Sequence, residues 1–220
     1  MSSVISSLKA IVPQPIKVAL KAARHALTPH DSIYDKRYYD EFIEGPAQSA
    51  AVIMARSMYE WKQPKAVIDV GCGTGALLAA FRDLGCSVRG LEYSDAGLDY
   101  CRARGIPVEK FNIEKDSFES SRADLVVSFE VAEHLAPRYA DGYVKLLCSM
   151  SKHIAMSAAT PGQSGTDHVN EQPHSYWIEK FGAAGYSFDA DVSRRLSIQW
   201  QQPGVAFWYS DNVMAFSRDK

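Results

Sequence analysis

The chain has 220 residues, of which 46% are hydrophobic and 23% are charged, which is the composition of an ordinary globular protein. Its net charge of −2 argues against a polyanion-binding protein, and no apolar run approaches the ~18 residues that a membrane span needs. The four cysteines form no CxxC pair, which argues against a structural zinc cluster and indicates a reducing, cytoplasmic environment.

Basic charge is concentrated at the amino terminus. Residues 1–30 contain four basic residues and no acid, whereas the remainder has 20 basic against 26 acidic residues. Apolar residues in this stretch fall on one face of two predicted helices, which Pro13 and Pro15 separate. These basic amphipathic helices suit an anionic membrane surface, an organelle transit peptide, or packing on the same domain or a partner subunit. We therefore treat residues 1–27 as a candidate peripheral membrane contact.

Residues 31–61 show the pattern of two further helices, divided at Gly45 and Pro46. They precede the first predicted strand along the chain. We expect the segment 31–63 to form a helical lid over the mouth of the sheet that follows.

From residue 64 to residue 220, short apolar runs alternate with helical patterns. Strands are predicted at 66–70, 87–93, 106–111, 123–129 and 152–158, and helices at 76–85, 94–105, 137–150 and 174–185. Two last strands, 186–192 and 206–216, are expected to be antiparallel because only a Pro203-Gly204 turn signal separates them. The pattern predicts an α/β, Rossmann-like three-layer sandwich with a seven-stranded, mostly parallel sheet and an antiparallel last strand.

A glycine-rich loop, "VIDVGCGTG" at 67–75, follows the first predicted strand directly and opens a helix. Gly71, Gly73 and Gly75 permit positive φ and a close approach of a ligand to the backbone. Asp69 would oppose a pyrophosphate but can hold a cationic amino-acid group. Glu92 ends the next strand, where a carboxylate grips a ribose diol in nucleotide-binding folds.

These residues, together with "GLEYS" and "DLVVSFEVAEHL", resemble the class I S-adenosylmethionine-dependent methyltransferases. The resemblance implies that S-adenosylmethionine is the cofactor, with the glycine loop at its methionine part and Glu92 at its ribose. Asn112 stands where most relatives carry Asp beside the adenine. The cofactor-binding residues expected from the resemblance are Asp69, Gly71, Cys72, Gly73, Gly75, Glu92, Tyr93, Asn112, Ile113 and Phe129.

The stretch "SFEVAEHLAP" places Glu130, Glu133 and His134 after the fourth predicted strand, at a spacing that shares one helical face. It resembles the E-x-x-E-H motif of ubiquinone-biosynthesis and small-RNA 3′-end O-methyltransferases, in which these residues hold a divalent ion. By the same resemblance, His168 is the fourth ligand, and the mixed O/N set suits Mg, Mn, Fe, Co or Zn. Metal-free activation of substrate by His134 or His168, or a purely structural role, are the alternatives.

An aliphatic hydroxyl needs a base or a metal before it can accept a methyl group, so these four residues are the candidate catalytic groups. We expect O-methylation of a small molecule, a sugar or a glycolipid. RNA 2′-O-methylation is the alternative, but residues 31–220 are net acidic, which makes a nucleic-acid partner unfavourable. A non-catalytic partner subunit is a further alternative. The aromatic residues Trp200, Phe207, Trp208 and Tyr209 suit either a pocket or the core, and the oligomeric state is left open.

Overall fold

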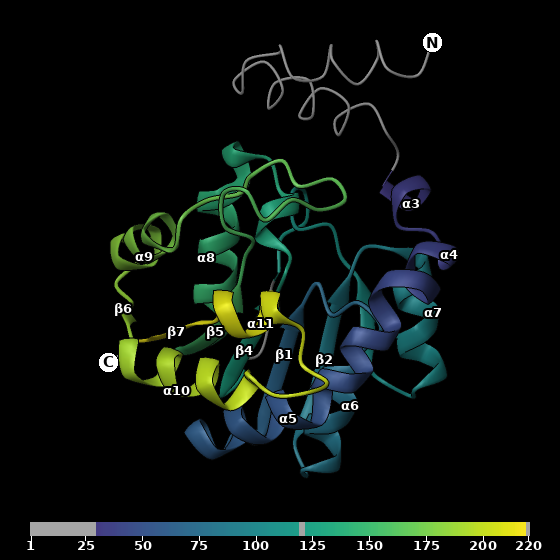
Figure 1. Ribbon diagram of the computed structural model, residues 1–220, viewed down its shortest axis with the longest axis horizontal. Coiled ribbons are helices and arrows are strands. Elements are labelled where there is room, and N and C mark those ends of the chain that lie inside the picture. The colour runs from purple at the N-terminus through teal and green to yellow at the C-terminus, as the bar shows by residue number, and fades with distance from the viewer. Residues whose placement is uncertain (1–29, 119–121, 219–220) are drawn as a thin grey trace.

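The structure is a computed structural model that describes residues 30–118 and 122–218 (Figure 1). The amphipathic helices predicted within the first 29 residues lie outside the described residues. Among the described residues, no helix combines the length and apolar character that crossing a membrane requires.

Seven strands form one sheet in the order β3-β2-β1-β4-β5-β7-β6. The five strands β1 to β5 pair in parallel, whereas β7 runs antiparallel to both β5 and β6. The predicted seven-stranded, mostly parallel sheet is confirmed. The strands are β1 Ala66–Val70, β2 Ser87–Glu92, β3 Val108–Lys110, β4 Leu125–Phe129, β5 His153–Ser157, β6 Ser187–Phe188 and β7 Met214–Ser217.

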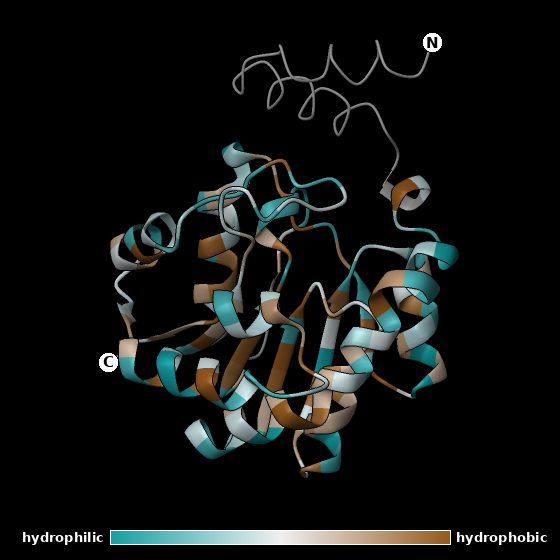
Figure 2. Cartoon of the chain, in the orientation of Figure 1, coloured by the Kyte–Doolittle hydropathy of each residue, from teal (hydrophilic) through white to brown (hydrophobic). Residues whose placement is uncertain are grey.

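Helices cover both faces of the sheet, and Figure 2 shows hydrophobic residues on the central strands between them. Val67 and Val127 belong to the core under α5, α6 and α10, whereas Ile68 and Val126 belong to the core under α8 and α9. Neighbouring residues of a strand point to opposite faces, so a strand covered on both sides must be apolar throughout. The main helices are α5 Glu44–Lys62, α6 Ala76–Asp83, α7 Asp95–Ala103, α8 Ala140–Met150, α9 His174–Ala183 and α10 Ala190–Trp200.

The carboxyl-terminal region differs from the prediction. The strand expected at 186–192 is only Ser187–Phe188, because the side chain of Asp189 accepts a hydrogen bond from Val192 N and starts α10. The strand expected at 206–216 shortens to β7, since α11 occupies Phe207–Asn212. Two helices therefore lie between the antiparallel strands, where the sequence indicated only a turn.

The expected break at Gly45 and Pro46 is also wrong. The chain stays helical from α4, Lys36–Tyr38, through a π-helical turn at Tyr39–Ile43 into α5. Proline lacks an N–H and is tolerated where the regular hydrogen-bond ladder is interrupted. Pro46 lies in the first turn of α5, directly after the π-helical turn, which is such a place. A short helix, α3 at His30–Ile33, precedes this run.

Candidate functional site

The glycine loop after β1 is shaped by two close approaches. Gly71 has φ of +73°, and a Cβ added there would lie 2.5 Å from Cγ2 of Val131, so another side chain would be strained as well as crowded. Gly73 has φ of +55°, and its nearest neighbour would be Cγ2 of Ile43 at 3.8 Å. The loop therefore presents bare backbone to the space beside Gly73, as close ligand approach requires.

Glu92 closes this loop from the end of β2. Its Oε2 accepts from Gly73 N at 2.7 Å, and its Oε1 accepts from Tyr93 N and Ser94 N, both at 2.8 Å. Burial raises the pKa of Glu92, and these backbone donors act in the opposite direction. Ser94 caps α7, because its side chain accepts from Gly97 N. The glycine loop and the predicted ribose-binding acid are thus one hydrogen-bonded unit.

Asp69 lies inside the same region and is only 4% exposed. Burial, followed by the nearby negative charge of Glu92, raises the pKa of Asp69 to about 8. A buried carboxyl group whose proton affinity is raised by a neighbouring carboxylate favours a cationic ligand, whose charge would relieve the repulsion.

A cavity of about 540 Å³ opens beside these residues. This volume falls in the range of roughly 300–1,000 Å³ typical of small-molecule sites. Nine of the ten predicted cofactor-binding residues line it, and these are Asp69, Gly71, Cys72, Gly73, Glu92, Tyr93, Asn112, Ile113 and Phe129. The tenth, Gly75, lies behind the loop, where an added Cβ would be 2.8 Å from Sγ of Cys101. At Asn112, the Oδ1 atom already accepts from Glu114 N at 2.9 Å within its own turn.

The predicted catalytic motif begins directly after β4 with a strained residue. Glu130 has φ of +56°, which is unfavourable for a residue with a side chain. Its Oε1 accepts from Ser157 Oγ at 2.7 Å, and its Oε2 is 3.3 Å from Nε2 of Gln163. Burial raises the pKa of Glu130. Glu130 lines the cavity, and neighbouring elements fix its orientation.

Glu133 does not line the cavity. It is fully buried, its Oε1 accepts from Ala159 N at 3.2 Å, and its backbone carbonyl accepts from Val169 N and Asn170 N. Burial, followed by the charge of Glu130, raises the pKa of Glu133 well above its usual value. Its Oε2 has no hydrogen-bond partner among the described residues. Glu133 therefore holds the loop after β5 against the motif, and its carboxyl group interacts with that of Glu130.

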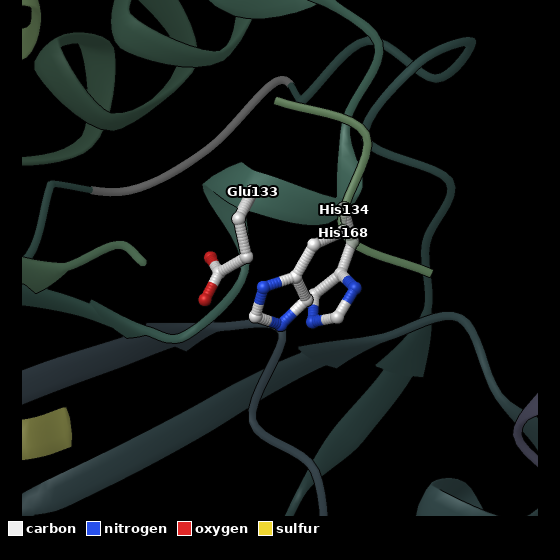
Figure 3. Close-up of side chains that lie close together, drawn as sticks. All are labelled: Glu133, His134 and His168. Atoms are coloured by element: carbon white, nitrogen blue, oxygen red, sulfur yellow. The ribbon is translucent and has the colours of Figure 1, made fainter. Parts of the chain in front are cut away.

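The two predicted histidines meet beside Glu133 (Figure 3). The ring centroids of His134 and His168 are 5.0 Å apart, and one ligand atom from each of Glu133, His134 and His168 lies within 4.8 Å of the others. His134 lines the cavity, whereas His168 lies behind it with Nδ1 3.0 Å from Oε1 of Glu171. The structure thus groups three of the four predicted ligands, and Glu130 lies outside that group.

Sequence reasoning missed the tyrosines of the preceding helical segment. Tyr34, Tyr38 and Tyr39 all line the cavity, and Tyr34 Oη lies 2.8 Å from Nδ1 of His134. Their clustering in "YDKRYY" was visible, but no local pattern says which strand end such a segment covers. The loop residue Asp167 also lines the cavity and was not predicted.

The four aromatic residues near the carboxyl terminus have different locations. Tyr209 lines the cavity, whereas Trp200 is fully buried in the core and donates from Nε1 to Ser57 Oγ at 2.7 Å. Phe207 is 59% exposed, and Trp208 packs on its ring.

Comparison with known proteins agrees with this geometry. A family described as "Methyltransferase domain" matches residues 39–155, just over half of the chain. The chain belongs to the class I S-adenosylmethionine-dependent methyltransferases.

A curated relative of the domain is the ubiquinone biosynthesis O-methyltransferase of Methylobacterium sp. (strain 4-46), which is 36% identical over 76 residues. That match covers 32% of this chain and 30% of the enzyme, so the chain matches less than a third of the relative's length.

Solved structures share the methyltransferase fold at low sequence identity. The magnesium protoporphyrin IX methyltransferase of Synechocystis PCC 6803, determined with bound S-adenosylhomocysteine, aligns with a TM-score of 0.62 and 16% identity over 82% of this chain and 86% of that one. The O-methyltransferase from a trans-AT polyketide synthase of Brevibacillus brevis aligns with a TM-score of 0.53 and 14% identity over 76% of this chain and 70% of that one.

Proposed function

We propose that the protein is an S-adenosylmethionine-dependent O-methyltransferase that acts on a hydroxyl group of a small molecule, a sugar or a glycolipid. The observation that carries this proposal is the position of His134. It lines the cavity after β4, whereas Glu92, the acid expected to bind the ribose, ends β2 on the other side of β1. In open α/β sheets, ligands bind at the carboxyl ends of the strands, where all these residues lie.

The cofactor end of the cavity suits S-adenosylmethionine. The bare backbone at Gly73 gives a ligand close access, and Glu92 stands ready to exchange backbone donors for ribose hydroxyls. Asp69 provides a carboxylate for the ammonium group of the methionine part. When bound, S-adenosylmethionine supplies an electrophilic methyl group on a sulfonium centre, so the protein has only to align and deprotonate the acceptor.

The acceptor end of the cavity suits a hydroxyl group beside an imidazole. A hydroxyl is a poor nucleophile until its proton is taken by a positioned base, and a histidine within reach supplies that base. We assign this role to His134. We propose that Glu130 fixes the cavity wall between the cofactor end and the acceptor end. The 36% identity over 76 residues to a ubiquinone biosynthesis O-methyltransferase supports a hydroxyl acceptor.

The charge of the cavity supports a small acceptor over RNA. Among its lining residues are five carboxyl groups and two basic side chains, Lys115 and Arg138. RNA binding depends on neutralising phosphates with basic side chains, and in this lining the carboxyl groups outnumber them. The intact glycine loop and the two buried acids likewise favour an enzyme over a non-catalytic partner subunit.

A metal-assisted version of the reaction is favoured by one specific observation. Oε2 of Glu133 is buried without a partner among the described residues, and one carboxylate oxygen of Glu133 lies within 4.8 Å of ligand atoms of His134 and His168. These three residues would hold a divalent ion through one oxygen and two nitrogens, a set that suits transition metals and zinc. Such an ion would act as a Lewis acid on the acceptor hydroxyl.

The test is a screen of hydroxylated acceptors with methyl-labelled cofactor, followed by kinetics of variants on the acceptor found. His134→Ala should lower turnover by at least ~100-fold, the lower range for a lost acid–base group, while the Kd for S-adenosylmethionine stays unchanged. His153→Ala is the matched control, because His153 begins β5 at the opposite end of the sheet. Normal turnover of His134→Ala would overturn the assignment.

The same assay distinguishes metal-free from metal-assisted activation of the acceptor hydroxyl. If His134 acts without metal, EDTA leaves turnover unchanged. If a metal is held, EDTA abolishes turnover, and His168→Ala loses activity together with bound metal.

A further inference from the structure

Two buried cysteines touch each other beside the cofactor half of the cavity. Sγ of Cys72, in the glycine loop, lies 3.6 Å from Sγ of Cys101 on α7, and both residues are free thiols. Sγ of Cys101 also donates to the backbone carbonyl of Gly73 at 3.4 Å. The pair therefore joins the loop that presents bare backbone to a ligand with the helix that follows β2.

Neighbouring glycines make room for the two sulfurs. A Cβ added at Gly90 of β2 would lie 2.6 Å from Sγ of Cys72, and a Cβ added at Gly75 would lie 2.8 Å from Sγ of Cys101. Each sulfur thus fills volume that a side chain would otherwise take. Close packing of this core leaves the two thiols little freedom to turn away from each other.

A disulfide between these thiols requires only a small movement. A disulfide bond is about 2.05 Å long, so the two sulfurs would have to approach each other by roughly 1.5 Å. Cys101 lies within the regular helix α7, whereas Cys72 lies in a loop whose three glycines all have positive φ. We expect the loop to supply most of the movement, because its backbone is not part of a regular hydrogen-bond ladder.

Exposure decides which thiol meets an oxidant first. Cys72 lines the cavity and is 8% exposed, whereas Cys101 is fully buried. The hydrogen bond with Cys101, followed by burial, raises the pKa of the Cys72 thiol well above its usual value. Since the thiolate is the reactive form, the pair should stay reduced during brief exposure and react only when exposure is sustained.

We propose that Cys72 and Cys101 form a reversible disulfide under sustained exposure to peroxide, and that this disulfide weakens the binding of S-adenosylmethionine. The sulfur of Cys72 attacks one peroxide oxygen, the O–O bond breaks, and a sulfenic acid and one water result. The sulfur of Cys101 then displaces the hydroxyl group of the sulfenic acid, which leaves as a second water with the Cys101 proton. The two thiols together lose two electrons, and one peroxide is reduced to two waters.

The effect on the cofactor follows from the contacts of Gly73. The disulfide removes the thiol that donates to the Gly73 carbonyl, and it pulls on the loop whose Gly73 N–H donates to Oε2 of Glu92. The loop and the acid expected to bind the ribose would then no longer fit the cofactor together. By linkage, bound cofactor must oppose formation of the disulfide by the same factor. The disulfide would act in this way whichever acceptor the protein methylates.

The test treats the full chain with hydrogen peroxide at pH 8, blocks the remaining thiols and then measures two quantities. Peptide mass spectrometry should find Cys72 linked to Cys101, with two hydrogens fewer than the reduced pair. Calorimetry should give a Kd for S-adenosylmethionine that is about 5–150-fold higher than before treatment, the usual range for coupling between sites. Dithiothreitol should restore the original Kd, which it would not do for oxidised methionine.

Two variants and one ligand serve as controls, and each protein is compared with its own untreated sample. Cys101→Ser cannot form the disulfide, so peroxide should leave its Kd unchanged. Cys148→Ser is the matched control, because Cys148 is a buried cysteine in the core on the opposite face of the sheet, and this variant should lose affinity as the natural protein does. Saturating S-adenosylhomocysteine should slow disulfide formation in the natural protein, a measurement that needs no variant.

Four results would each overturn the proposal. These are absence of the linked peptide after prolonged treatment, a linked peptide with unchanged Kd, an equal loss of affinity in Cys101→Ser, and disulfide formation at the same rate with and without S-adenosylhomocysteine.

Discussion

The cofactor half and the histidine half of the cavity are built in different ways. Glu92 and Gly73 are 19 residues apart in sequence, and the loop, strand and helix between them form one local unit. His134 and its partner Tyr34 are 100 residues apart, and His168 arrives from a third segment. The first half depends on a strand-loop-helix pattern, whereas the second depends on how distant segments cover the sheet.

This difference explains what the sequence could predict. Regular βα alternation indicated the parallel strands, and the glycine loop with Asp69 and Glu92 indicated the cofactor site, because each rests on local periodicity or spacing. The π-helical turn before Pro46 and the helix capped by Asp189 were missed. In both places, a short polar or proline-containing stretch suits a turn as well as a helix, and only the contacts of the folded chain decide between them.

The same reasoning holds for the candidate site. The motif spacing placed Glu130, Glu133 and His134 together, yet the structure directs Glu130 to Ser157 and buries Glu133 away from the cavity. Glu130 has a positive φ and the motif forms only a 3-10 turn at Ala132–His134, so the regular α-helical face that the spacing assumed does not form. Tyr34 and Asp167 could not be found at all, since neither belongs to a local pattern.

The largest expected effect in the cofactor half is the loss of stability caused by a substitution in the glycine loop. Gly71→Ala should lower the free energy of unfolding by about 2–5 kcal/mol, because it adds a Cβ at positive φ and forces it against Val131. Gly142→Ala is the matched control, because that helical glycine has no neighbour within 4 Å of an added Cβ. It should raise stability by up to ~1 kcal/mol. Urea unfolding that shows equal stability for the two variants would contradict the close approach.

The next effect is on ligand affinity. Glu92→Ala should weaken S-adenosylmethionine binding by ~1–3 kcal/mol, because charge-assisted hydrogen bonds to the cofactor are lost. Glu109→Ala on β3 is the control, since that carboxylate pairs with Arg89 on the surface. If calorimetry gives Glu92→Ala the same Kd for S-adenosylmethionine as the natural protein, Glu92 is not a cofactor-binding residue.

A smaller effect should appear in the pH dependence of binding. Asp69 has a pKa of about 8 in the unliganded protein, and a cationic ligand requires it to ionise. Affinity should therefore fall as pH decreases below 8, by at most about tenfold per pH unit, and Asp69→Asn should abolish that dependence. If the affinity of the natural protein for S-adenosylmethionine does not change between pH 6 and pH 8, Asp69 does not interact with the bound cofactor.

The Asp69 carboxyl also affects the stability of the unliganded chain, and its raised pKa determines whether stability rises or falls with pH. The folded state holds the Asp69 proton more tightly than the unfolded state does. The contribution of Asp69 to stability is therefore present at acidic pH and is lost as pH rises toward about 8. Compared with Asp69→Asn, the natural protein should lose stability over this window, as thermal unfolding at several pH values can show.

The smallest effect is expected from the amino terminus. Removing residues 1–27 should leave the affinity for S-adenosylmethionine unchanged, while abolishing co-sedimentation with anionic liposomes at low salt. The acid-free, two-faced sequence of this segment motivates the expectation, and the segment lies outside the described residues. If the full chain does not sediment with such liposomes, the membrane contact is wrong and packing on a partner takes its place.

The central claim is that one cavity holds S-adenosylmethionine in its local half and performs acceptor chemistry in its long-range half. Calorimetric titration of the natural protein and of His134→Ala with S-adenosylmethionine tests it most directly. The account predicts saturable one-to-one binding with the same Kd in both proteins. Absence of binding to the natural protein, or a large loss of affinity in His134→Ala, would contradict it.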